Sequence, residues 1–592
     1  MELHDVATLS CNLLFPSLIL LFSLVIWLKL VKKKNLNLPP SPPKLPIIGN
    51  IHQLGKLTHR SLRDLSRNYG SLLLLQLGYN PTILVSSADM VREIVKNHDV
   101  VCSDRPKTTS MDIMFYGCKG MCLGPYGEYW RRVKKMSVVE LFSHERVQSF
   151  QFVRDEEVEH LVNQINCACL EGESIDLSEM LMSVLSNIVS RCVLSHKSDG
   201  CSKFGQLGKR ILILLTSFCI GDMFPYLRWL DVVTGFIPSL KALSMEFDAF
   251  LDQVIEEHRA LENHEENNHK KDFVSIIMQL QKDGMLEMDL TRDNIKAILL
   301  DMFVGGTETS TTTAEWMMAE LLKHPHAMKK VQQEVRDVVG NKSKVDMEDI
   351  SKMEYLKCVL KETFRLHPAG ALVPRKTSAN VKLGGYDIPS DTTILINIWA
   401  IQRDPKWWEN PEEFIPERFE KSSIDFKAAG EIAENLDMTE VYGFSVTKKI
   451  PLHVQPIPRF QPALGLDQQR RDSTTSRRDR ALDLINIWVI QRDPKWWENP
   501  EEFIPERFEK SSIDFKGEHF HFTPFGFGRR RCPAIPFGVA SVEYLIANLL
   551  YRFDWKLAAS EIAENLDMTE VYGLSVTKKI PLHVQPIPRL SV

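Results

Sequence analysis

The chain has 592 residues, of which 44% are hydrophobic, and a formal net charge of -5 at pH 7. This length and apolar content allow a large buried core, and the nearly balanced charge argues against nucleic acid as a partner. The eleven cysteines are scattered, and the close pairs Cys118/Cys122 and Cys167/Cys169 have no second pair or histidine set to complete a zinc site. The composition therefore predicts a globular protein with reduced thiols.

The N-terminal segment is strongly apolar. Residues 13–28 are almost wholly apolar, and Lys29 with the lysines at 32–34 ends the run. This pattern predicts a membrane anchor over residues 1–34, with the rest of the chain on the cytosolic side. The run is short for a full span, so a cleaved signal peptide is the alternative, although no small-residue cleavage site follows. The proline-rich residues 35–50 predict a stiff hinge.

A long helix is predicted from residue 291 to residue 323, with an apolar first half. Its middle is locally weak, because Gly305-Gly306 costs about 1 kcal/mol per glycine and the hydroxyls of residues 307–313 can bond back to the preceding turn. Such a weak point predicts a bulge with room beside it, where Glu308 and Thr309 offer an acid and an alcohol. The alternative is a flexible, hydroxyl-rich core helix.

Two shorter motifs follow this helix. Glu362 and Arg365 are three residues apart, which places them on one face of a helix where they can form an ion pair. Because such pairs occur on many solvated helices, this pair alone indicates little. The sequence Pro-Glu-Arg-Phe then occurs twice, at 416–419 and at 505–508.

The C-terminal part of the chain contains an internal repeat. Residues 395–427 recur as 484–516 with one change, and residues 428–459 recur as 558–589 with two changes. The first copy lacks the stretch equivalent to 517–557, and a polar linker that is predicted to be disordered separates the copies. Two near-identical copies with such a deletion cannot stack as a solenoid.

Removal of residues 396–484 would leave a continuous chain of 503 residues. We therefore predict one domain in two parts, residues 51–395 and 484–592, around a partial duplicate at 396–483. A tandem duplication and a gene prediction that merges exons of two neighbouring copies both explain this pattern. Because the entropy of loop closure grows only slowly with length, the insert is compatible with folding.

The loop at 524–533 carries one cysteine among glycines, arginines and phenylalanines. A thiolate at Cys532 would suit an iron centre, and the arginines and loop amides are expected to lower the pKa of its sulfur. If the iron belongs to a haem, Phe525 covers the sulfur side of the ring, Gly528 lets the backbone approach, and Arg530 points at a propionate. The alternative is a buried structural cysteine beside a solvated arginine patch.

The pattern Phe-x-x-Gly-x-Arg-x-Cys at 525–532 resembles the haem-ligand loop of the cytochrome P450 monooxygenases. The stretch Gly-Gly-Thr-Glu-Thr-Ser at 305–310 is similar to the oxygen-activation pattern of that family, and the glutamate–arginine helix followed by Pro-Glu-Arg-Phe resembles its Glu-Arg-Arg triad. One departure is Ala534, which replaces the usual glycine and is expected to be tolerated. The resemblance covers nearly the whole chain apart from the insert and implies a mainly α fold with small β-sheets.

The resemblance implies that the protein is a haem-thiolate monooxygenase. Cys532 would ligate the iron of haem b, while Glu308 and Thr309 would deliver protons as the oxygen–oxygen bond of dioxygen breaks. Electrons would come from NADPH through a cytochrome P450 reductase, with cytochrome b5 as a second candidate donor. One oxygen atom would enter a small hydrophobic substrate.

Other residues would hold the haem or the scaffold. Lys134 stands where the family usually has arginine. A lysine keeps the positive charge but lacks the planar guanidinium group, so its contact with a propionate is expected to be weaker. Besides Arg530, the residues expected to hold the propionates are Trp130, Lys134 and Arg375. The structural triad would consist of Glu362, Arg365 and Arg507.

The anchor and the proline-rich hinge resemble those of P450s in the endoplasmic reticulum membrane, and the chain as a whole is most similar to plant enzymes that modify terpenoids, alkaloids, phenylpropanoids and oximes. Two alternatives to this function remain. One is a P450-fold isomerase or dehydratase that needs no dioxygen, against which the intact Glu308/Thr309 pair argues. The other is a duplicated, haem-poor pseudoenzyme.

By family analogy the substrate pocket is mostly apolar and is lined by residues 102–123, the region of Ala297 and Asp301, residues 369–373 and Leu574.

Overall fold

The structure is a computed structural model. It describes residues 36–196, 203–217, 219–262, 272–286, 288–397, 414–415, 502–503, 505, 520–557, 563, 566–573 and 575–588. The predicted anchor at 1–34, Arg507, Leu574 and nearly all of the predicted insert lie outside these residues.

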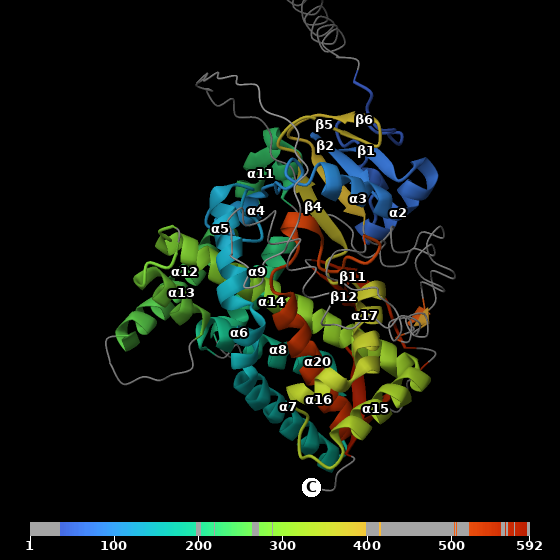
Figure 1. Ribbon diagram of the computed structural model, residues 1–592. Coiled ribbons are helices and arrows are strands. Elements are labelled where there is room, and N and C mark those ends of the chain that lie inside the picture. The colour runs from blue at the N-terminus through green and yellow to red at the C-terminus, as the bar shows by residue number, and fades with distance from the viewer. Residues whose placement is uncertain are drawn as a thin grey trace, which may run out of the picture.

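Helix α14 (Arg292–Lys323) is the long helix predicted for residues 291–323. The Thr291 hydroxyl accepts a hydrogen bond from the Asn294 N–H, and the Asn294 side chain accepts one from the Thr291 N–H, so a capping box starts the helix. Pro325 begins the next helix, α15 (Pro325–Val339). Most residues of α14 are buried, and the helix runs through the centre of the molecule (Figure 1).

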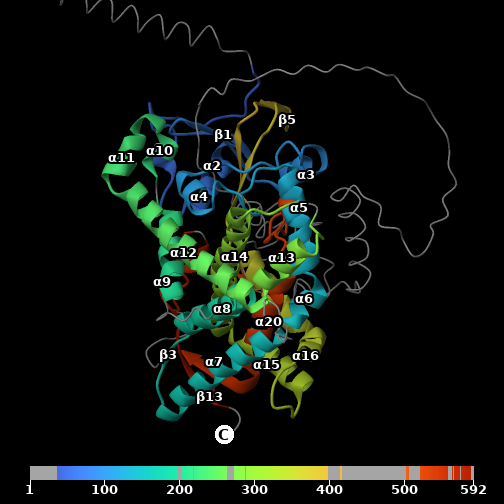
Figure 2. The same ribbon diagram turned by 90° about the vertical axis from the view of Figure 1, so that its left-hand side faces the viewer.

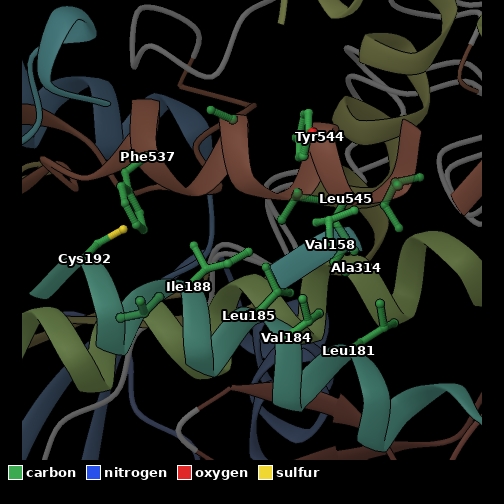
Figure 3. Close-up of a cluster of buried hydrophobic side chains, with 14 of the residues drawn as sticks. Val158, Leu181, Val184, Leu185, Ile188, Cys192, Ala314, Phe537, Tyr544 and Leu545 are labelled. Atoms are coloured by element: carbon green, nitrogen blue, oxygen red, sulfur yellow. The ribbon is translucent and has the colours of Figure 1, made fainter. Parts of the chain in front are cut away.

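Helices α8 (Leu177–Leu194) and α20 (Ile535–Arg552) pack against α14 and form the main core with it. In Figure 3 the apolar side chains of α8 and α20 point toward one another, among them Leu185, Ile188 and Leu545. Among the described residues, α8 is the one helix long and apolar enough to span a membrane. Since 67% of it is buried inside the protein, it is a core helix.

The remaining helices surround this core. They are α2 (Thr58–Tyr69), α3 (Ala88–Asn97), α4 (Thr109–Met114), α5 (Glu128–Met136), α6 (His144–Ser149), α7 (Gln151–Glu171), α9 (Lys203–Thr216), α10 (Ile220–Met223), α11 (Arg228–Val233), α12 (Phe236–Glu262), α13 (Phe273–Lys282), α16 (Met347–Lys352) and α17 (Glu354–Leu366). Short helical turns lie at η1 (Ile51–Gln53), η2 (Ser137–Leu141), η3 (Pro225–Leu227) and η7 (Gly528–Arg530).

The largest sheet has four strands in the order β1-β2-β7-β4. Strands β1 (Leu72–Leu77) and β2 (Asn80–Val85) form a hairpin, and β7 (Thr393–Asn397) pairs parallel with β2 and antiparallel with β4 (Leu372–Lys376). Leucines and isoleucines of this sheet form a second core cluster with α2 and α3, at the end of the molecule that lies at the top of Figures 1 and 2. The predicted mainly helical fold with small sheets is therefore confirmed.

The other sheets are small. Three strands pair in the order β10 (Phe553–Leu557), β13 (His583–Pro588) and β3 (Ile175–Asp176). Two hairpins are formed by β5 (Val381–Leu383) with β6 (Tyr386–Ile388), and by β11 (Glu570–Tyr572) with β12 (Val576–Lys578).

The two copies of the repeat meet in one short sheet. Strand β8 (Phe414–Ile415) of the first copy pairs in parallel with β9 (Glu502–Phe503) of the second, with Phe414 opposite Glu502. The equivalent segments therefore lie side by side, one residue out of register. Strand β9 also contacts α17, the helix that carries the predicted glutamate–arginine pair.

Candidate active site

Cys532 lies in a tightly folded loop that forms one wall of a cavity. The Cys532 N–H donates a hydrogen bond to the Phe525 carbonyl at 2.9 Å, and Gly526 has a left-handed φ of 73°, which favours glycine. The loop thus turns back on itself and places Cys532 at a cavity of about 170 Å³. The cavity is also lined by Arg105, Met121, Cys122, Trp130, Lys134, Val373, Phe525, Gly526, Arg530, Arg531 and Pro533.

Gly528 has a left-handed φ of 57° and lies against Asp99, which follows α3. A Cβ on Gly528 would be 2.6 Å from Oδ1 of Asp99, whose carboxylate also accepts a hydrogen bond from the Arg529 N–H at 3.1 Å. The close approach predicted for Gly528 is therefore made by an aspartate side chain. Ala534 is the N-cap of α20 with a φ of -90°, so the backbone there suits alanine as well as glycine.

Burial raises the pKa of the Cys532 thiol. The Ala534 N–H and the cations of Lys134 and Arg531 oppose this shift, but they do not outweigh the loss of hydration. The prediction that the cationic loop keeps this sulfur ionised is therefore wrong for the polypeptide alone. Burial therefore favours the thiol form in the polypeptide alone, and coordination to a metal would deprotonate it.

Two buried guanidinium groups, those of Arg105 and Arg530, line the cavity, and Arg375 lies beside them. Each donates to backbone carbonyls: Arg530 to Ser103 at 2.6 Å, Arg375 to Phe527 at 2.8 Å, and Arg105 to Pro374. Other nitrogens of the three groups are buried and have no hydrogen-bond partner among the described residues. These nitrogens are Nε of Arg105, Nε and Nη1 of Arg375 and Nη1 of Arg530.

The pKa values of all three arginines are lowered, although Asp99 acts in the opposite direction on Arg375 and Asp104 on Arg530. Burial lowers the pKa of Arg105 to about 10, that of Arg375 to about 9 and that of Arg530 to about 8, and repulsion from neighbouring arginines adds to the last two shifts. Buried cations of this kind need a charged partner. The two propionates of a haem fit the demand, because carboxylates accept strong hydrogen bonds from guanidinium groups.

Arg105 was not among the predicted site residues. It lies in the segment 102–123 that was predicted to line the substrate pocket. Its sequence context, directly before Pro106, does not indicate a contact with the cavity beside Cys532. Its partner Pro374 is 269 residues away in the chain. A short-range sequence pattern therefore cannot predict the position of Arg105.

Trp130 and Lys134, both on α5, complete the cluster of cations and aromatic rings. The Trp130 Nε1–H donates to the Met121 carbonyl at 2.8 Å, and the Arg530 guanidinium lies 4.2 Å from the Trp130 ring, a cation–π contact. The Lys134 ammonium donates to the Arg529 carbonyl and lies 5.4 Å from the same ring. The structure therefore brings Trp130, Lys134 and Arg530 together at the cavity.

The middle of α14 is helical throughout, so the predicted bulge is absent. The Thr309 hydroxyl does bond back, donating to the Gly305 carbonyl at 2.7 Å, but the helix continues past it. Open space exists instead at Gly305, where a Cβ would meet nothing within 4 Å. The same stretch lies against the start of α20, the helix that follows the cysteine loop, because a Cβ on Gly538 would be 3.8 Å from the Ser310 Oγ.

Glu308 is a largely buried acid. Burial raises its pKa to about 7, and a hydrogen bond from the Ser575 backbone N–H opposes part of that shift. Its Oε2 atom has no hydrogen-bond partner among the described residues. Near neutral pH this carboxyl therefore exists in both protonation states, as a proton donor requires.

Glu362 and Arg365 form the predicted ion pair on α17. The Arg365 Nε donates to Oε2 of Glu362 at 2.7 Å and its Nη2 donates to Oε1 at 2.7 Å, and both side chains are fully buried. This bidentate geometry confirms the pairing. Arg507, the predicted third member of the triad, lies outside the described residues.

Asp301 was predicted only to line the substrate pocket, but it also holds a loop in place. Its carboxylate accepts hydrogen bonds from the backbone N–H groups of Cys122, at 2.8 Å, and of Met121. A Cβ on Gly120 would be 2.1 Å from its Oδ2, so the loop needs glycine there. Burial raises the pKa of Asp301 to about 7.

Comparison with known proteins gives a consistent result. The family model described as "Cytochrome P450" matches residues 39–435 and 483–584, and the interruption at 436–482 falls inside the predicted insert. The chain is 41% identical to a phenylacetaldehyde oxime monooxygenase of Prunus mume over 564 residues, which covers 94% of this chain and 90% of the relative. It is 38% identical to a desmethylyatein synthase of Sinopodophyllum hexandrum over 585 residues, which covers 99% and 100%.

A solved structure shares the fold. A zebrafish cytochrome P450 with abiraterone superposes with a TM-score of 0.64 at 21% identity, which covers 91% of this chain and 100% of that one. At this level of identity the match concerns the fold alone.

Proposed function

The chain belongs to the cytochrome P450 family and is a P450 monooxygenase, and from this premise we propose that it oxidises a small hydrophobic metabolite of plant specialised metabolism. Support comes from the mostly apolar residues of the predicted pocket and from relatives whose names describe an oxime monooxygenase and a desmethylyatein synthase. Phenylacetaldehyde oxime, the compound in the name of the Prunus mume relative, is therefore the first substrate to test.

The residues present fit haem b as the cofactor. Cys532 would ligate its iron, while Arg105, Arg375 and Arg530 would bind its propionates, with Trp130 and Lys134 packed beside them. The observation that carries this proposal is the group of three buried guanidiniums at the Cys532 cavity, whose free N–H donors find no acceptor among the described residues. When bound, the haem supplies the activation of dioxygen and the transfer of one oxygen atom.

Glu308 and Thr309 would handle protons in this reaction. The raised pKa of Glu308 lets it hold a proton near neutral pH and release it when a stronger base forms nearby. The Thr309 hydroxyl donates to the Gly305 carbonyl, so its oxygen lone pairs are available to accept a hydrogen bond from a water or a bound ligand. The open space at Gly305 would accommodate that ligand.

The setting follows from the sequence patterns. Residues 1–34 would anchor the protein in the endoplasmic reticulum membrane, and residues 35–50 would form the hinge to a cytosolic catalytic domain. Electrons would come from NADPH through a cytochrome P450 reductase, with cytochrome b5 as a second donor. The catalytic domain would comprise residues 51–395 and 484–592, with residues 396–483 as a displaced duplicate.

The test is the carbon monoxide difference spectrum of the reduced full-length protein in microsomes, followed by turnover of phenylacetaldehyde oxime with NADPH and reductase. We expect the band of a thiolate-ligated haem, its loss in Cys532→Ser, and product that depends on NADPH. Absence of that band from the full-length chain and from a variant lacking residues 396–484 would overturn the proposal. A band in the shortened variant alone would show that the insert blocks the site.

A further inference from the structure

One face of α14 carries polar side chains into the protein core. Glu308, Thr312 and Glu315 follow at spacings of four and three residues, so they share a face of the helix. This face packs against the β11–β12 hairpin, since β12 contacts α14 and the Trp316 Nε1–H donates to the Val576 carbonyl at 2.9 Å. The hairpin lies beside α14 in Figure 1.

At one end of this face, Glu308 meets Ser575. The Ser575 backbone N–H donates to the Glu308 carboxylate, and the serine side chain is 1% exposed. Neither the Ser575 Oγ nor the Glu308 Oε2 has a hydrogen-bond partner among the described residues. An ordered water that accepts from the Ser575 hydroxyl and donates to the Glu308 carboxylate would satisfy both of these buried polar atoms.

Thr312, in the middle of the face, differs from its neighbours. Thr311 and Thr313 donate to the carbonyls four residues before them, at 3.0 and 2.9 Å. Thr312 is 1% exposed, yet within the described part of the chain its Oγ1 makes no hydrogen bond. A buried hydroxyl that leaves the helix carbonyl unused is available to a water molecule.

At the far end the face approaches solvent through Glu315. Burial raises the pKa of Glu315, and its Oε1 accepts a hydrogen bond from the Ser178 hydroxyl at 2.5 Å. Ser178 is only partly buried. The Lys578 cation lies close enough to lower the pKa of the Glu315 carboxyl in part, and the Asp176 carboxylate raises it. A second buried acid therefore lies between Thr312 and the partly exposed Ser178.

We propose that this face of α14 is a proton route, on which protons pass from solvent at Ser178 through Glu315 and a water at Thr312 to Glu308. The proposal rests on the proposed role of Glu308 as proton donor. Residues at these spacings are separated by about 4.5 to 6 Å along the helix axis, a distance that one bridging water spans. Each proton that leaves Glu308 is replaced by one that enters at Glu315, and the Thr312 hydroxyl gives up one proton and gains another.

Thr312 and Glu315 act on this route through Glu308 and do not touch the reacting atoms, so they count as positioning residues. A purely structural role, in which the same groups only orient the hairpin, predicts that their removal affects stability but not proton exchange. The two possibilities differ in how fast the Glu308 carboxyl exchanges with solvent. That rate can be measured without turnover.

The first experiment follows deuterium exchange of the buried carboxyl bands in the infrared spectrum of the purified full-length protein, with Glu308→Gln to identify the Glu308 band. We expect Thr312→Val to slow exchange at Glu308 by at least about tenfold, in line with the size of proton-transfer effects. Thr311→Val is the matched control, because that hydroxyl already bonds to the Thr307 carbonyl and faces Met182 of α8. Unchanged exchange in Thr312→Val would overturn the proposal.

The second experiment measures hydrogen peroxide released per NADPH oxidised with the reductase, which needs no identified substrate. Glu315→Gln should increase this ratio several-fold and change its dependence on pH and on deuterated solvent, while Thr311→Val should not. If Glu308→Gln itself leaves the ratio unchanged, the proposed role of Glu308 fails. If Glu308→Gln raises it and Glu315→Gln does not, the route alone is wrong.

Discussion

The wild-type protein should lose stability as the pH rises and Glu308 ionises, and replacing Glu308 by glutamine should remove this loss. The folded protein raises the pKa of this carboxyl from 4.5 to about 7, so the folded state holds the proton more tightly than the unfolded chain. The stabilisation this gives is complete below pH 4.5 and is lost as the pH rises toward 7, at about 1.4 kcal/mol per pH unit. The total loss between these limits is about 3 kcal/mol.

Glu308→Gln keeps the shape of the side chain and cannot ionise. Its free energy of unfolding relative to the wild type should therefore increase by about 3 kcal/mol between pH 5 and pH 8, with no further change above pH 8. Urea unfolding followed by circular dichroism at several pH values measures this difference, with exposed Glu171→Gln as control. A difference that stays constant with pH would refute the claim that burial dominates the titration of Glu308.

Three further outcomes follow from the site. Arg375→Leu should lower haem affinity by about 10- to 100-fold in a haem titration, which corresponds to the loss of one charge-assisted hydrogen bond. The same change should raise the stability of the haem-free protein in thermal unfolding, because it removes a buried cation. Arg365→Ala should destabilise the fold by about 3 to 5 kcal/mol in urea unfolding, because it leaves the Glu362 carboxylate buried without this partner. Gly120→Ala should cost about 1 to 3 kcal/mol in the same assay, because its Cβ would overlap the Asp301 carboxylate; an unchanged stability would contradict the close contact between this loop and Asp301.

The parts of the fold and site that the sequence predicted are those set by local pattern. Helix α14 follows from its apolar run and its Thr291 cap, and the Glu362–Arg365 pair follows from a spacing of three on a helix. Cys532 follows from a loop motif. In each case the information lies within one element.

The parts that were missed depend on contacts between distant segments. The Arg529 N–H donates a hydrogen bond to Asp99, which is 430 residues away in the chain, and the Cys122 N–H donates one to Asp301, which is 179 residues away. A period of 3.6 or 2 residues indicates which face of an element is buried but not which element covers it. The pKa of Cys532 was misjudged for the same reason, because charges are visible in the sequence and burial is not.

The repeat raises the question of which copy fills the triad. With the second copy docked, Arg507 lies 112 residues after Leu395 and 25 before Cys532; with the first docked, Arg418 lies 23 after Leu395 and 114 before Cys532. Because closure entropy depends on the logarithm of loop length, these two arrangements cost nearly the same. Chain connectivity alone therefore does not select the second copy, although the contact of β9 with α17 favours it.

This near-equality makes a prediction for the proposed triad. In the full-length chain, Arg507→Ala should cost clearly less than the roughly 3 to 5 kcal/mol typical of breaking a buried ion pair, because Arg418 can take the place of Arg507. The double variant Arg418→Ala/Arg507→Ala should cost more than the sum of the single changes. In a chain without residues 396–484, Arg507→Ala alone should have the full cost, since no second copy remains. Equal costs of Arg507→Ala in the two chains, measured by urea unfolding, would show that the copies do not exchange.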